Sequence, residues 1–145
     1  MRASIVRRLL PACVMAAVSC VGFALEPSRV SHPEGASIEV DAHVTALKRG
    51  YYLATVNLRN TSTETLKLDR SMFALTAPDP VSFVMANRVS FGRQAFRLPP
   101  TVAPGSFANG EIYFGIRGAS RPTEPVTLRI VLPDGEHRFE FTVAD

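Results

Sequence analysis

A strict two-residue alternation over residues 37–47, SIEVDAHVTAL, constrains this chain more than any other feature. Apolar side chains occupy every second position, and charged or polar side chains fill the positions between them. The apolar set is Ile38, Val40, Ala42, Val44 and Ala46. This period of two is typical of a β-strand with one buried side and one solvent-facing side, and it differs from the 3.6-residue period of a helix.

Further segments with strand character follow along the chain at a spacing close to ten residues. They are residues 51–60, 66–68, 73–75, 106–116, 126–132 and 137–143. Pro- and Gly-rich turns separate them, and PDGE at 133–136 predicts a hairpin between the last two. Such short connections leave no room for helical crossovers, so the strands should pair mostly antiparallel. We therefore expect an all-β domain of seven or eight strands over residues 37–145, arranged as a two-sheet sandwich, with a small barrel as the alternative.

The N-terminus has the pattern of a secretory signal peptide over residues 1–24. Arg2, Arg7 and Arg8 precede an apolar run, and small residues end it before Leu25. That run is shorter than the roughly 20 apolar residues of a membrane-spanning helix. Two variants stay open, namely a lipid anchor at Cys20 and a twin-arginine signal. We expect an exported protein, periplasmic or extracellular, in which the Pro-containing residues 25–36 form a flexible lead-in.

Removal of this leader changes the charge and the cysteine content of the chain. The full sequence has 16 basic and 13 acidic residues, and the three leader arginines account for the excess. The mature chain is then formally neutral, which argues against a nucleic-acid-binding protein. Both cysteines, Cys13 and Cys20, lie in the leader, so the domain must be held together by packing without a disulfide.

The order of strands and turns resembles the telokin-like, immunoglobulin-fold domains of bacterial secreted proteins and lipoproteins. The similar segments are YLATVNLRNTSTETLKL, FAL, VAPGSFANGEIYFGI and PVTLRIVLPDGEHRFEFTV. In that family an Asn-containing turn follows the second strand, and a Pro-Gly turn, here Pro104-Gly105, introduces a strand with Phe114. The resemblance implies an immunoglobulin-like β-sandwich that serves in binding. It implies no catalytic residues.

The sequence shows no motif for catalysis or for a cofactor. It has no Gly-x-Ser-x-Gly element, no phosphate-cradling Gly run and no paired metal-ligand motif. We therefore predict a protein that is not an enzyme and that needs no cofactor. As an alternative, long-range convergence of soft ligands would make a periplasmic copper-type metal-handling protein. Those ligands would be His32, His43, Met72, Met85 and His137.

The best candidate for a partner surface is residues 87–100, NRVSFGRQAFRLPP. The residues expected to contact a partner are Arg88, Phe91, Arg93, Phe96 and Arg97. Arginine and aromatic side chains are enriched at tight interfaces, and an irregular edge strand offers open backbone groups for strand addition. A simpler interpretation is that the arginines protect the edge while the phenylalanines pack inward. We expect the domain to bind another protein or a component of the cell envelope.

The polar segment Asn60-Thr61-Ser62 also matches the N-glycosylation sequence. It follows one predicted strand and precedes another, and its side chains are of the kind that favour turns. We interpret it as a turn and not as a binding site.

Overall fold

The computed structural model describes residues 22–47, 51–78, 82–85, 96–117 and 125–143. Within these ranges the chain is all-β, and a single 3₁₀ turn, η2, is its helical element. The elements in order are β1 Gly22–Ser31, β2 Ile38–Leu47, β3 Tyr51–Asn60, β4 Leu66–Lys67, η2 Arg70–Met72, β5 Phe73–Thr76, β6 Ser82–Met85, β7 Thr101–Val102, β8 Phe107–Arg117, β9 Val126–Leu132 and β10 Gly135–Val143. The predicted all-β class is thus confirmed.

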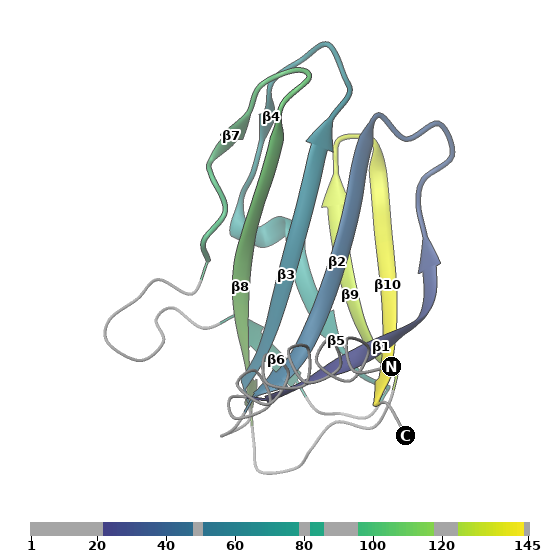
Figure 1. Ribbon diagram of the computed structural model, residues 1–145, viewed down its shortest axis with the longest axis vertical. Coiled ribbons are helices and arrows are strands. Elements are labelled where there is room, and N and C mark those ends of the chain that lie inside the picture. Colours follow the sequence, from purple (N-terminus) through teal and green to yellow (C-terminus); the bar gives the residue numbers. More distant parts are fainter. Residues whose placement is uncertain (1–21, 48–50, 79–81, 86–95, 118–124, 144–145) are drawn as a thin grey trace, which may run out of the picture.

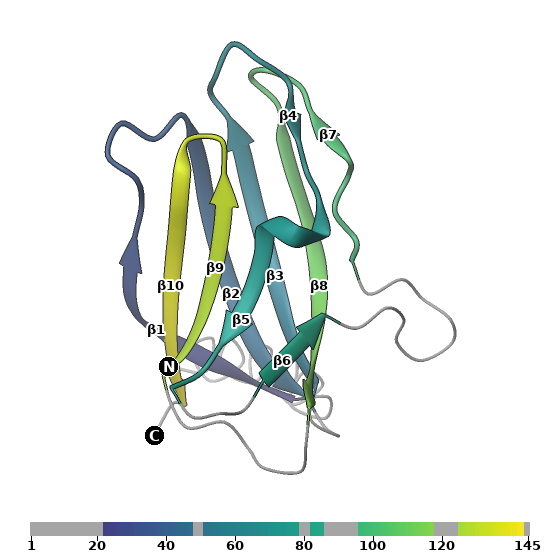
Figure 2. The ribbon, with the colours of Figure 1, turned by 180° about the vertical axis from the view of Figure 1, so that it is seen from behind.

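Eight of the strands form one sheet in the order β5-β9-β10-β1-β2-β3-β8-β6, and β4 and β7 form a small second sheet. Every described strand pair is antiparallel, as the short connections predict. The large sheet curls nearly into a barrel. Strands β2, β3 and β8 lie on one side of it, and β5, β9 and β10 lie on the other (Figures 1 and 2). The outer strands β5 and β6 approach each other in space.

The expectation of a flexible lead-in over residues 25–36 is wrong for its first part. Residues 25–31 continue strand β1 and pair with β10, from Leu25 opposite Val143 to Ser31 opposite Arg138. The preceding residues 22–24 pair instead with β2. Only Leu25 of β1 is buried, so the strand lacks the apolar alternation that identified the others. Backbone pairing to two neighbours, rather than side-chain burial, holds this segment in place.

The core lies between the two sides of the curled sheet and consists of the alternating apolar positions. In β2 all five predicted residues from Ile38 to Ala46 are buried. In β3 and β8 the inward positions include Val56, Ile112 and Phe114, and β10 adds Phe141. Burial of these side chains is the main favourable contribution to folding, at about 1.5–3 kcal/mol for each large apolar residue. The inward and outward faces predicted from the alternation are therefore the observed ones.

The segment after β3 is a turn, as predicted, but its first residue is fully buried. The Asn60 side-chain amide donates hydrogen bonds to the carbonyl oxygens of Glu64 at 2.8 Å and Val102 at 3.0 Å. Its Oδ1 accepts from the backbone N–H of Ser62 at 3.0 Å and from the Ser62 hydroxyl at 2.6 Å. The turn is thus organised around one buried amide that also connects to β7.

Candidate ligand-binding face

Two of the five predicted partner residues, Phe96 and Arg97, lie in the described part of the chain. Arg88, Phe91 and Arg93 lie outside it. The ring of Phe96 is partly buried and packs against Phe73, with ring centroids 5.5 Å apart. Phe96 is therefore a core contact, which agrees with the simpler interpretation of this segment.

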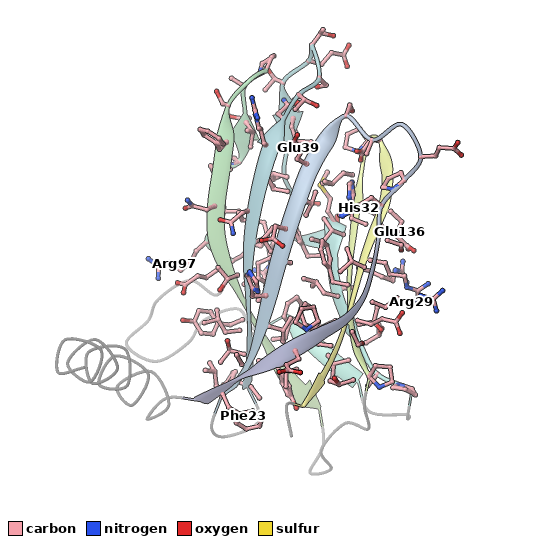
Figure 3. All side chains as sticks on the ribbon, turned by 45° about the vertical axis from the view of Figure 1, so that its right-hand side comes forward. Phe23, Arg29, His32, Glu39, Arg97 and Glu136 are labelled. Carbon is pink, nitrogen blue, oxygen red and sulfur yellow. The ribbon has the colours of Figure 1, made fainter. Side chains whose placement is uncertain are left out.

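Arg97 has a different position, at the edge of the outward face of β8. Its backbone N–H donates to the carbonyl oxygen of Glu111 at 2.9 Å, and its guanidinium lies 3.3 Å from the Glu111 carboxylate. Gly110 makes this approach possible, because a Cβ at that position would meet the carbonyl oxygen of Arg97. The chain at Arg97 is thus bonded to β8, and the exposed Arg97 side chain projects outward beside that strand (Figure 3).

Next to Arg97, the outward faces of β3 and β8 form an open, shallow hollow of about 490 Å³. It is lined by Thr55, Asn57, Arg97, Asn109, Gly110 and Glu111. A second hollow of about 440 Å³ lies beside the first and spans β2, β3 and the start of β8, where the exposed Phe107 lines it. The two hollows share Asn57 and Asn109. We call the two hollows together the polar groove.

Strand register explains why these side chains lie together. Asn57 of β3 lies directly opposite Asn109 of β8 on one side and Asp41 of β2 on the other. Thr55 lies opposite Glu111 in the adjoining row of outward residues. Since directly opposed residues on one face of an antiparallel pair are about 4.5–5.5 Å apart at Cβ, such rows form continuous polar lines across the strands.

The charges along the polar groove are largely paired with one another. Glu39 lies 3.9 Å from Arg59 in addition to the pair of Arg97 with Glu111. The side chains of Asn57 and Asn109, in contrast, make no hydrogen bond to any other described residue. The groove therefore offers amide donors and acceptors with little net charge.

An aromatic ring lies at one end of the groove. Phe107 is 77% exposed, although β8 places it beside buried positions. The guanidinium of Arg59 lies 6.0 Å from the centre of its ring. The groove therefore has one exposed apolar ring at its end, beside the two amides.

The histidines predicted as metal ligands separate into two locations. His43 is an exposed residue of β2 whose ring lies 3.4 Å from Asp41. His32 and His137 meet, with 2.8 Å between their Nδ1 atoms, although they are 105 residues apart in the sequence. Met72 packs against the hydrophobic core, as its neighbouring Phe73 suggests. In the part of the chain that is described, no three His, Cys, Asp or Glu side chains gather in a way that could hold a metal ion.

No model of a known protein family matches this chain, and neither a curated protein nor a solved structure matches it significantly. Among the described residues, no helix is long and apolar enough to cross a membrane. The polar groove is therefore interpreted from its own chemistry.

Sequence reasoning located the outward positions of the groove but missed that they form one surface. The alternation in β3 already placed Thr55, Asn57 and Arg59 on the solvent side. What it lacked was the register with β8, which brings Asn109 and Phe107 alongside them. An excess of Asn and Thr, rather than Lys and Glu, at solvent-facing strand positions is the signal that could have drawn attention to this face.

Proposed function

We propose that this protein is an exported, non-enzymatic binding module that holds an uncharged, hydroxyl-rich ligand of the cell envelope in the polar groove. The observation that carries the proposal is the row of Asn57 and Asn109, whose amides have no described partner, beside the exposed ring of Phe107. Hydroxyl groups of an oligosaccharide would pair with these amides, and an apolar sugar face would pack against the ring. The self-paired charges of the groove favour a neutral ligand over a charged one.

The non-enzymatic part of the proposal is supported by the contacts of the described histidines. His43 is solvated and pairs with a carboxylate. His32 and His137 contact each other and an aspartate. In the described ranges no serine hydroxyl lies in hydrogen-bond contact with any of these rings, a contact that activation of a serine nucleophile by histidine requires.

The groove is tested by binding of short neutral oligosaccharides, immobilised as an array and then titrated in solution. We expect the double change Asn57→Ala and Asn109→Ala to weaken binding by about fivefold or more, because two or more hydrogen bonds of about 0.5–1.5 kcal/mol each are lost. Phe107→Ala should weaken it as well. Val131→Ala is the matched control, since Val131 is an exposed apolar residue of β9 on the other side of the sheet.

Equal affinity of the double variant and the unchanged protein would remove the polar groove as the binding site. Binding of a stoichiometric protein from the native host instead, weakened by Arg97→Glu but not by the double change, would favour the protein-partner form of the proposal. The thermal midpoint of each variant should stay close to that of the unchanged protein, because all these residues are solvent-facing.

The immunoglobulin-like arrangement is part of the same proposal. Its support is that β1 pairs with β10 from Leu25 onward and with β2 only through residues 22–24, which a cut before Leu25 removes. Without those residues the curled sheet separates into two halves, β5-β9-β10-β1 and β2-β3-β8-β6. An experimental structure in which β5 and β6 are joined by backbone hydrogen bonds would favour a closed barrel instead.

Export is proposed from the leader pattern and is tested by the intact mass of the protein from its native host. We expect a start at Leu25. Such a cut removes Gly22–Ala24, the part of β1 that pairs with β2, and keeps the part that pairs with β10. A lipid-bearing start at Cys20 would instead indicate an anchored protein that retains the whole strand, and a mass that includes the leader would contradict export.

A further inference from the structure

Three side chains form a continuous hydrogen-bonded line where the segment after β1 meets the turn between β9 and β10. Asp134 Oδ1 lies 3.0 Å from His137 Nε2, and His137 Nδ1 lies 2.8 Å from His32 Nδ1. The side chain of His137 is fully buried and that of Asp134 is only 4% exposed, whereas His32 is a solvent-exposed residue. Figure 3 shows His32 beside β10. We call these residues the His-His-Asp line.

The hydrogen-bonding roles along the line follow from simple proton counting. An ionised carboxylate only accepts, so His137 Nε2 carries a hydrogen and donates it to Asp134. In the neutral ring His137 Nδ1 is then an acceptor, and His32 Nδ1 must donate to it. A single added proton fits at the outer nitrogen of His32. A second one would place an N–H against an N–H between the two rings.

The position of the two rings distinguishes a shared proton from a bound metal ion. The ring centroids are 5.1 Å apart, and the facing nitrogens are 2.8 Å apart. Each nitrogen lies about 1.15 Å from the centre of a ring with bonds of about 1.35 Å, so the two nitrogens lie on the line that joins the centroids. The N–H of His32 Nδ1 therefore points straight at the lone pair of His137 Nδ1. A metal ion between them, at about 2.0 Å from each nitrogen, would hold them about 4 Å apart in this arrangement.

The hydrogen bonds of the His-His-Asp line also join the β1–β2 connection to the β9–β10 hairpin. Asp134 Oδ2 accepts the backbone N–H of Ile38 at 3.1 Å, at the start of β2. Pro33, next to His32, lies against Gly135, whose φ of +130° places it in a conformation that side chains rarely adopt. The ring of Phe139 contacts His32 edge-on, at 5.6 Å between centroids. Loss of the contact between His32 and His137 would thus release one end of this connection.

We propose that the His-His-Asp line is an acid-sensitive latch that holds residues 32–38 against the β9–β10 hairpin. The latch is closed with zero or one added proton, and uptake of a second proton separates the rings and opens the connection. Histidine is the side chain whose unperturbed form changes charge between about pH 5 and 8, so the experiment covers that range. The proposal is independent of the polar groove, which lies on β2, β3 and β8.

The groups that surround His32 and His137 determine how the latch responds to acid. Asp134, in the β9–β10 turn, contacts His137. The uncharged backbone N–H of Ile38, at the start of β2, donates to Asp134. The apolar ring of Phe139, on β10, contacts His32. The neighbouring residues Glu136 and Arg138 are exposed and pair with each other at 3.9 Å. The contacts described for the two rings are with each other, with Asp134 and with Phe139, and among these partners the Asp134 carboxylate is the charged group.

The test is amide hydrogen exchange of the full domain, followed residue by residue between about pH 7.5 and about pH 4.5 and expressed relative to the exchange rate of an unstructured peptide at each pH. In the unchanged protein we expect protection of the Ile38 amide to fall by at least about tenfold on acidification, because one linked proton changes an equilibrium by up to tenfold per pH unit. In His32→Gln the fall should be less than about threefold. Glutamine can donate to or accept from His137 but takes up no proton.

His43→Gln is the matched control, since His43 is an exposed histidine beside a carboxylate outside the latch. It should respond to acid like the unchanged protein. The latch is refuted if the unchanged protein and His32→Gln lose protection equally, or if His43→Gln abolishes the response. Retention of one zinc or copper ion per chain after equilibrium dialysis, lost in His32→Gln, would overturn the proton assignment in favour of a metal site.

Discussion

Replacement of Asn60 by alanine is expected to lower the free energy of unfolding by about 2–4 kcal/mol. The side chain is fully buried and makes four hydrogen bonds, through which it holds both the turn after β3 and the carbonyl of Val102 in β7. Its removal leaves the buried carbonyl oxygen of Val102 without this donor, which costs about 1–3 kcal/mol, and loses the bonds that order the turn, whereas the Glu64 carbonyl still accepts from the Ser62 hydroxyl. Urea unfolding followed by circular dichroism measures the loss.

The matched control is Asn57→Ala, a change of the same residue type on the same strand. Asn57 is solvent-facing and makes no hydrogen bond to another described residue, so its replacement should change the stability by less than about 0.5 kcal/mol. Equal losses in the two variants would mean that the buried amide does not organise the turn. The same burial bears on glycosylation: both hydrogens of the Asn60 amide donate to carbonyls, so the folded domain would not accept a glycan there.

Phe114→Ala is expected to be the most destabilising single change in β8, at about 3–5 kcal/mol. Phe114 is 2% exposed and belongs to the core between the two sides of the curled sheet. Removal of its ring loses apolar contacts and leaves a cavity that antiparallel neighbours on either side cannot close. The thermal midpoint should fall by roughly ten degrees or more, as about 4 °C for each kcal/mol lies where the ranges for 60–100-residue and 150–250-residue domains meet.

Phe107→Ala on the same strand provides the comparison. Its ring is 77% exposed, so little apolar area is lost from the core and the midpoint should stay within a few degrees of the original. This contrast also strengthens the binding experiment, because a variant that loses ligand without losing stability identifies a surface role. A large loss of stability in Phe107→Ala would contradict both assignments.

The sequence predicts a strand well when burial of its side chains determines the conformation. It predicts a strand poorly when backbone pairing with neighbouring strands does. The alternation from Ile38 to Ala46 predicted β2 and its buried face, and Gly135 after Asp134 predicted the last hairpin. Strand β1 could not be found in this way, because only Leu25 in it is buried. Its conformation is imposed by the two strands beside it, which no local pattern records.

The same holds for the candidate sites: the sequence indicates which residue types are present, but not which distant residues come into contact. Phe96 and Arg97 were singled out together, yet one packs inward and the other extends over the polar groove. The contact between His32 and His137 joins positions 105 residues apart. Residue types alone gave, as an alternative, convergence of these two histidines with others on a metal ion. Only the ring geometry indicates a shared proton.

The pairing of β1 with β10 has a consequence for how this chain reaches its native state. Leu25 finds its partner in Val143, at the far end of the sequence, so the sheet lacks this pairing until nearly the whole chain has been synthesised. Non-local strand pairing of this kind slows folding, since a long loop must be closed before any contact stabilises it. If the protein is exported as we propose, this late pairing would leave the β1–β10 part of the sheet unformed until the C-terminal strand has also crossed the membrane.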